Sequence, residues 1–229
     1  MSGPGRPVLR LDLHNHTIAS SDGFMTPRVL LERARARGLA CIAVTDHGSL
    51  EGARACAALA AADPSLPRVI PGEEIETTVG EIIGLFVQEQ IPEGLSLDET
   101  VERIRAQGGI VYLPHPCDEV RRSAVHGEAR LRAARAADVV EVQNGRSLRP
   151  AYDRDALRLA TRAGALLGAG SDAHYPGEVG QAYVEVDRIP GRDDFIEVVR
   201  SGRPAPVPHV AAYARSWFYL TRTKLVKLR

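Results

Sequence analysis

The chain has 229 residues, with 29 basic and 29 acidic side chains and a formal net charge of +0. Hydrophobic residues make up 44% of it and charged residues 25%, which is the composition of a globular protein with its own core. The balanced charge excludes a uniformly basic surface for nucleic acid or an anionic membrane. No apolar run approaches ~18 residues, no signal-peptide core precedes the first motif, and the three cysteines form no CxxC pair. We therefore predict a cytoplasmic protein with no membrane partner.

Short apolar runs alternate with amphipathic segments along the whole chain. In chain order, the predicted elements are a strand at 8–13, a helix at 26–38, a strand at 41–47, a helix at 50–62, strands at 68–77 and 81–87, a helix at 96–109, a strand at 110–116, a helix at 128–136, a strand at 139–144, a helix at 152–163, strands at 166–174 and 182–187, and a helix at 193–201. Thr26-Pro27 is a typical helix start, and Ser96 with Glu99 forms a capping box.

This repetition of strand and helix predicts parallel strands that are joined by crossover helices. Several of the runs are β-branched and apolar on both faces, as buried parallel strands are. No change of composition marks a domain boundary. We therefore predict an α/β fold, a closed or nearly closed barrel of about seven strands, although a flat doubly wound sheet has the same local pattern.

Histidines gather where the predicted strands end. Five of the seven stand at such positions: His14, His16, His47, His115 and His174. In α/β barrels the loops after the C-terminal strand ends converge on one site, so these five side chains should meet although they are spread over the chain. The other two, His126 and His209, lie in polar or Pro-rich loops, and we assign them no role.

Carboxylates accompany the histidines at the same level of the predicted barrel. They are Asp22, Asp46, Glu73, Glu74 and Asp172. His14 and His16 are two residues apart on an extended segment, as are Asp172 and His174, so each pair can point the same way. Imidazole and carboxylate without thiolate suit divalent cations, and one tetrahedral ion needs only four ligands. The number of ligands therefore predicts more than one metal ion.

The motifs DLHNHT, SDG, TDHG, PGEEI, PHP and GSDAH, in this order, resemble the PHP (polymerase and histidinol phosphatase) family over residues 9–190. The resemblance implies a distorted (β/α)7 TIM-like barrel that holds two or three divalent ions, which would be zinc, manganese or iron. It also implies a single PHP domain over residues 1–229, in which residues 191–229 form a C-terminal helix and a tail docked on the barrel.

The resemblance implies ligands residue by residue. The first ion would bind His14, His16, Glu74 and Asp172, the second Glu74 and His115, and the third His47, His174 and Asp22. Glu74 is preferred to Glu73 because the bridging Glu of the family stands two residues after the motif glycine, here Gly72. Two histidines of many members are missing, one in the run after Glu74 and one near residues 139–144, where Glu141 and Asn144 stand. The number of bound ions therefore stays open.

The resemblance implies hydrolysis of a phosphoric ester by a metal-activated water, without a protein nucleophile. The substrate would be a small phosphorylated metabolite or nucleotide. A histidinol-phosphatase-type monoesterase, an exonuclease or nucleoside-bisphosphate phosphoesterase, and a non-catalytic accessory protein are the alternatives. A largely intact ligand set favours an enzyme. Candidates for binding the substrate phosphate lie in loops after strands: Arg121, Arg122, Asn144 and Arg146.

The last 17 residues, 213–229, differ from the rest of the chain. They carry five basic and no acidic side chains, interleaved with Trp217, Phe218 and Tyr219. Such interleaving can bind single-stranded nucleic acid, but large apolar groups are costly to leave exposed. We predict that this tail docks on the barrel, with nucleic acid as the less favoured partner. The natural substrate and the oligomeric state have no signal in the sequence.

Overall fold

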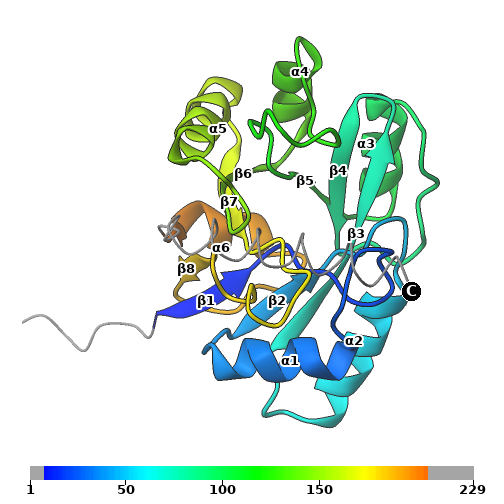
Figure 1. Ribbon diagram of the computed structural model, residues 1–229, viewed down its shortest axis with the longest axis vertical. Coiled ribbons are helices and arrows are strands. Elements are labelled where there is room, and N and C mark those ends of the chain that lie inside the picture. Colours follow the sequence, from blue (N-terminus) through cyan, green and yellow to red (C-terminus); the bar gives the residue numbers. More distant parts are fainter. Residues whose placement is uncertain (1–7, 206–229) are drawn as a thin grey trace, which may run out of the picture.

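The computed structural model describes residues 8–205, so the predicted tail at 213–229 lies outside the described residues. Within them, one sheet curls into a nearly closed barrel with helices on its outside (Figure 1). The strands are β1 (Leu9–Asp12), β2 (Cys41–Val44), β3 (Arg68–Thr77), β4 (Gly80–Leu85), β5 (Ile110–Leu113), β6 (Val139–Asn144), β7 (Leu166–Gly170), β8 (Val184–Val186) and β9 (Arg203–Pro204). The helices are α1 (Pro27–Ala36), α2 (Glu51–Ala62), α3 (Leu97–Ala106), α4 (Ala129–Ala136), α5 (Pro150–Ala163) and α6 (Phe195–Ser201). The predicted α/β barrel is thus confirmed.

The strand order is β7-β6-β5-β4-β3-β2-β1-β8-β9. β1, β2 and β3 pair in parallel, as do β5, β6 and β7, but β4 is antiparallel to both β3 and β5. The prediction of parallel strands is therefore wrong for β4. The cause is the short link, because Thr77 pairs with Gly80 across only two residues, and a parallel crossover needs a dozen or more. Gly80, with φ of 131°, supplies the backbone conformation of this hairpin.

The first and seventh strands close the barrel directly at one end. Leu13 N donates to Ala169 O (3.2 Å), and Asp172 N donates to His14 O (2.7 Å). At the opposite end β8 pairs antiparallel with β1, and β9 pairs with β8. The described residues thus form nine strands rather than about seven, because two short strands extend the sheet beyond β1.

Apolar side chains fill the barrel and leave only one end for polar groups. The interior includes Leu11, Leu13, Ile70, Ile83, Tyr112 and Val139, and α6 closes it with Phe195 and Val198. Outside the barrel, α1 and α2 pack on one part of the sheet, while α3, α4 and α5 cover another (Figure 1). The three cysteines are free and buried. Within residues 8–205, no helix combines the length and the apolar character that crossing a membrane requires.

Predicted caps hold the first and third helices. The Thr26 side chain accepts from Val29 N before α1, and Pro27 is its first residue. Before α3, the Ser96 hydroxyl accepts from Glu99 N while the Glu99 carboxylate accepts from Ser96 N, which is the reciprocal capping box. These caps fix where the helices begin, and therefore how much chain remains for the loops that follow the strands.

Candidate metal centre

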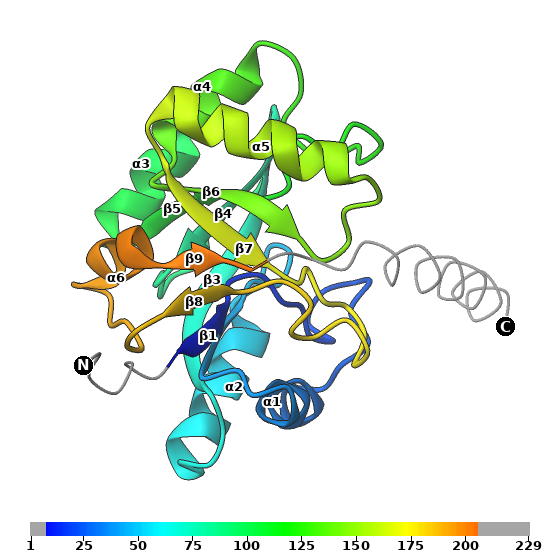
Figure 2. The same ribbon diagram turned by 90° about the vertical axis from the view of Figure 1, so that its left-hand side faces the viewer.

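The eight predicted ligands come together at one end of the barrel, on loops and strands that are distant in sequence. Figure 2 shows the loops after β1 and β7 on the side to which the arrowheads of β6 and β7 point. The contributors are the loop after β1 with His14, His16 and Asp22, the loop after β2 with His47, β3 with Glu74, the loop after β5 with His115, and the loop after β7 with Asp172 and His174. Convergence of strand ends thus produces the cluster, as expected for a barrel.

Glu74 is the centre of the cluster. Its Oε2 lies 3.2 Å from His14 Nε2, 3.3 Å from His16 Nε2 and 3.4 Å from His47 Nδ1. Its Oε1 lies 3.1 Å from His115 Nε2. One carboxylate, 1% exposed, therefore faces four imidazoles, the position expected of a bridging ligand.

Glu73 points away from this cluster. Its Oε2 accepts from Ile91 N (3.0 Å) on the other side of β3. The alternation of side chains along an extended strand explains why two adjacent glutamates have different surroundings.

A second group of side chains lies beside the first, at the more exposed edge. His16 stacks against His47 with ring centroids 4.7 Å apart, and its ring centroid lies 4.1 Å from that of His174. Asp22 Oδ2 lies 3.1 Å from His174 Nε2, and Asp22 Oδ1 lies 3.7 Å from His47 Nε2. Asp22 is 52% exposed, so this group opens to solvent while Glu74 and His14 are enclosed.

Two of the three arginines predicted to bind substrate reach the cluster. Arg121 Nη2 lies 2.7 Å from Asp172 Oδ2, and Arg146 Nη1 lies 2.9 Å from His174 Nδ1. Asn144, also predicted, donates from Nδ2 to Asp172 Oδ2 (3.2 Å). Arg122 is exposed, and within residues 8–205 no hydrogen bond or ion pair joins it to the cluster.

Glu81 is a member of the cluster that the sequence did not reveal. Its Oε1 lies 3.5 Å from His47 Nδ1 and its Oε2 3.5 Å from His115 Nε2. Glu76 pairs with Glu81 across the hairpin, so Glu81 shares the face of β3 on which Glu74 lies. A hairpin with its turn at Gly80 would have predicted this register, and the register would have placed Glu81 beside Glu74. An acid thus stands on the strand where a family histidine is missing.

Glu141 contacts two histidines of the cluster, His14 and His115. Its Oε1 lies 3.2 Å from His14 Nδ1, and its Oε2 accepts from His115 N (2.7 Å) and Asn144 Nδ2 (2.8 Å). A hydrogen bond from Nδ1 to a carboxylate orients the ring and would leave the lone pair of Nε2 available to a cation on the side where Glu74 lies. The sequence showed Glu141 only as an acid near a missing histidine, because its partners are distant in the chain.

The backbone is constrained at two of the clustered residues. His115 and Asp172 have φ of 28° and 52°, in a region that non-glycine residues seldom adopt. Asp172 is held there by the hydrogen bond from its N to His14 O (2.7 Å). Strain of this kind persists where surrounding contacts over-determine it, and it is common at functional sites.

Charged neighbours shift the pKa values of the buried groups in the cluster. Burial alone would lower the pKa of His14, but Glu74, Asp172 and Glu141 raise it well above its usual value. Burial would raise the pKa of Glu74, but His14 and the other imidazoles hold it well below its usual value. Burial and the Glu74 charge raise the pKa of Glu81. Glu74 is therefore firmly ionised, whereas its neighbour Glu81 is harder to ionise.

The donor arrangement fits divalent cations. His14 Nε2 and His16 Nε2 approach to 3.0 Å, although two facing imidazole nitrogens share at most one proton. Asp172 Oδ1 and Glu81 Oε2 are buried and accept no hydrogen bond. Four overlapping groups bring three ligand atoms together: His14, His16 and Glu74; His14, His115 and Asp172; His16, His47 and His174; and His47, Glu74 and Glu81. Buried acceptor atoms that outnumber the protons between them are what a cation would satisfy.

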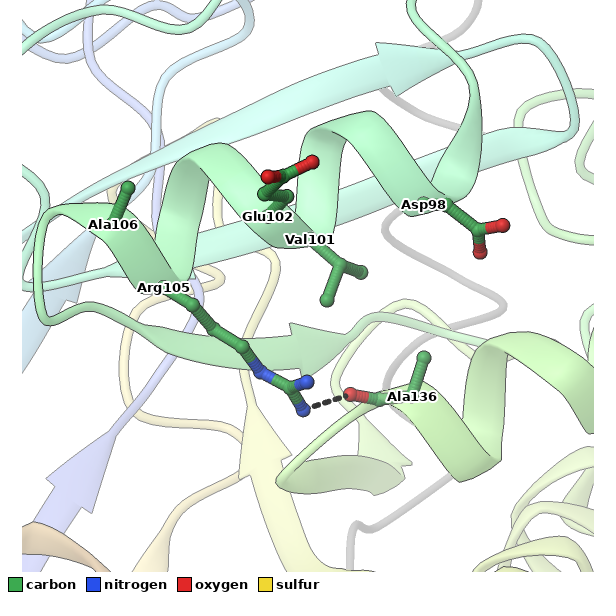
Figure 3. Close-up of a pocket in the computed structure, with 6 residues that line it drawn as sticks. All are labelled: Asp98, Val101, Glu102, Arg105, Ala106 and Ala136. Atoms are coloured by element: carbon green, nitrogen blue, oxygen red, sulfur yellow. Dashed lines mark hydrogen bonds between the residues drawn. The ribbon is translucent and has the colours of Figure 1, made fainter.

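A surface hollow lies away from the cluster. It measures about 520 Å³ between α3 and α4, and Figure 3 shows Arg105 donating to Ala136 O (2.9 Å) at its edge. Its lining residues are Asp98, Val101, Glu102, Arg105, Ala106 and Ala136. None of them is a predicted ligand or substrate-binding residue, so we assign the hollow no part in the metal centre.

Comparison with known proteins agrees with this architecture. A model of the PHP domain matches residues 12–108, and a model of a PHP-associated region matches residues 151–204. An uncharacterized protein of Methanocaldococcus jannaschii is 36% identical over 184 residues, which cover 79% of this chain and 72% of that protein. The 3',5'-nucleoside bisphosphate phosphatase of Chromobacterium violaceum is 38% identical over 89 residues, which cover 37% of this chain and 30% of that protein.

A solved structure from Bacteroides vulgatus, a two-domain protein containing a predicted PHP-like metal-dependent phosphoesterase, has a similar fold. It aligns with a TM-score of 0.72 and 18% identity over 88% of this chain and 65% of that chain. The fold and the cluster thus define an α/β barrel whose candidate site lies at the C-terminal strand ends. The chain belongs to the PHP family, as the motif resemblance predicted.

Proposed function

We propose that the protein is a metal-dependent phosphoesterase that hydrolyses a small phosphorylated metabolite or nucleotide. The observation that carries the proposal is the contact of one buried carboxylate, Glu74, with four imidazoles, while two arginines stand beside the same cluster. Cation ligands and phosphate-binding groups within one site are the requirements of metal-assisted phosphoryl chemistry.

The proposed ligands divide into three sets, of which the first two share Glu74. His14, His16, Glu74 and Asp172 would hold one ion, His115, Glu74 and Glu81 a second, and His47, His174 and Asp22 a third. Glu81 is the addition to the sequence-based assignment, since it provides an oxygen ligand on the strand that lacks the family histidine. We expect two or three zinc, manganese or iron ions, with availability deciding among them.

Each side chain has a defined task in the proposed reaction. When bound, the ions would lower the pKa of a coordinated water and neutralise negative charge on the phosphoryl group. Arg121 and Arg146 carry planar guanidinium groups that bind phosphate oxygens in pairs, and Asn144 keeps Asp172 in position. Glu141 orients His14 through its Nδ1. Arg122, on the surface, stays a prediction.

The proposal is tested by metal content and turnover of the same variants. His14→Ala and Asp172→Ala should each remove bound metal and the hydrolysis of phosphate esters together. Asp98→Ala is the control for Asp172→Ala, because Asp98 is exposed on α3 and pairs with Arg132, outside the cluster. Full turnover of p-nitrophenyl phosphate by His14→Ala, or absence of turnover of every monoester and diester by metal-loaded wild type, would contradict the proposal.

A further inference from the structure

An aromatic pair lies at the rim of the candidate metal centre. Phe24, in the loop after β1, stacks on Tyr175, in the loop after β7, with ring centroids 4.7 Å apart and an interplanar angle of 11°. Phe24 follows Asp22 by two residues, and Tyr175 follows His174 directly. The two loops that carry the pair lie on the same side of the barrel (Figure 2).

Backbone hydrogen bonds fix this pair relative to the cluster. Phe24 N donates to His174 O (3.0 Å). His174 N and Tyr175 N both donate to Glu178 Oε2, at 2.8 Å and 3.2 Å. Asp22 Oδ2 lies 3.1 Å from His174 Nε2, so both loops are tied to one imidazole. These contacts place the aromatic pair beside the proposed ligands His174 and Asp22.

The exposure of Phe24 is unusual for its position. It is 45% exposed although Tyr175 covers one of its faces, and within residues 8–205 it is the single exposed aromatic side chain. Ile18, 57% exposed, lies on the same loop, and its N donates to Met25 O (2.9 Å). A rigid ring that presents its surface to solvent beside a catalytic cluster is suited to binding a flat apolar group.

We propose that Phe24 and Tyr175 form a stacking platform for the base of a nucleoside phosphate, so that nucleotides are the substrate class; this rests on the proposed phosphoesterase function. A nucleotide joins a flat aromatic base to a phosphate through one sugar, and the platform begins one and two residues from the proposed ligands His174 and Asp22. Aromatic side chains stack on every base, so the platform selects for the presence of a base rather than its identity.

The first test compares adenosine 5′-monophosphate with ribose 5-phosphate, which has the same sugar and phosphate without the base. Wild type should prefer the nucleotide through a lower KM, and Phe24→Ala should reduce the ratio of the two kcat/KM values roughly 5- to 150-fold. Phe24→Tyr, which keeps an aromatic ring, should restore the ratio. Equal kcat/KM for both substrates in wild type, or an equal loss for both in Phe24→Ala, would overturn the inference, since the latter means that the pair only holds the loops.

A binding measurement separates this inference from the proposed function. The riboside of 2-aminopurine carries a fluorescent base and no phosphate, and stacking should quench it on wild type but not on Phe24→Ala. Leu157→Ala is the control, because Leu157 is 44% exposed on α5, away from the pair. Quenching without any ester hydrolysis would refute the phosphoesterase and support the platform, whereas hydrolysis without quenching would refute the platform alone.

Discussion

Replacing Glu141 by glutamine tests the arrangement of the metal centre most directly. The four groups around its carboxylate are all donors: His14 Nδ1 at 3.2 Å and the Tyr112 hydroxyl at 2.8 Å on Oε1, and His115 N at 2.7 Å and Asn144 Nδ2 at 2.8 Å on Oε2. Glutamine turns one of these oxygens into an NH2 group, which accepts no hydrogen bond. The amide should place its NH2 at Oε1, because His115 N and Asn144 Nδ2 on Oε2 can only donate, whereas the Tyr112 hydroxyl and His14 Nδ1 can accept.

The size of the effect follows from these four contacts. The Tyr112 hydroxyl then loses the acceptor for its proton, and an unpaired buried donor costs about 1–3 kcal/mol of unfolding free energy. When the amide NH2 faces Nδ1, the His14 ring favours the tautomer with its proton on Nε2, the nitrogen 3.2 Å from Glu74. Loss of an orienting carboxylate usually lowers metal affinity about 10- to 100-fold, which corresponds to about 1.4–2.7 kcal/mol.

The assay is a metal titration of turnover, together with competition against a coloured chelator. In Glu141→Gln the half-saturating metal concentration should rise about 10- to 100-fold, and activity should recover at excess metal. Glu102→Gln, an exposed exchange of the same type on α3, should titrate like wild type. A folded Glu141→Gln protein with wild-type metal affinity would refute the assignment of Glu141 as the residue that orients His14.

Two further predictions concern stability. Burial raises the pKa of the Glu73 carboxyl from 4.5 to about 7, so ionisation of this carboxyl opposes folding. With a chelator present, raising the pH from 4.5 to 7 should therefore lower the unfolding free energy of wild type by up to about 3 kcal/mol more than that of Glu73→Gln. Equal pH dependence of the two proteins in urea titrations would contradict this. A Cβ on Gly170 would lie 2.3 Å from His14 Cβ, so Gly170→Ala should cost about 1–3 kcal/mol and lower the Tm. Gly191→Ala, whose Cβ would meet its nearest atom at 3.6 Å, is the control, and equal Tm values for both variants would contradict the packing argument.

Local signals in the sequence were sufficient for the helices and for most of the strands. Thr26 and Ser96 act as caps because their hydroxyls accept from backbone N–H groups three residues later, a contact that depends on local sequence alone. The strand-end histidines predicted a common site because parallel strands bring their C-terminal ends to one edge. His14 and His174, 160 residues apart, belong to the same cluster for this reason.

Contacts between distant strands explain what the sequence did not reveal. Glu81 follows a turn within an apolar run, and only the pairing of Glu76 with Glu81 determines which face it occupies. Glu141 lies on β6, and its role depends on a contact with His14, 127 residues away. The spacing of apolar residues alone does not determine such register, so neither acid was among the predicted ligands.

Glu81 adds a second buried carboxylate next to Glu74, and this affects the charge of the proposed metal centre. Glu74 and Glu81 face the same two imidazoles, of His47 and His115, and both carboxylates are almost fully buried. Burial and the Glu74 charge raise the pKa of Glu81, and an ionised pair of buried acids is costly without a compensating cation. An imidazole at this position would contribute no negative charge, whereas the carboxylate contributes one unit. A divalent ion at the proposed Glu81 position should therefore be attracted more strongly by charge than at a histidine, which favours hard, oxygen-preferring ions such as manganese over zinc there.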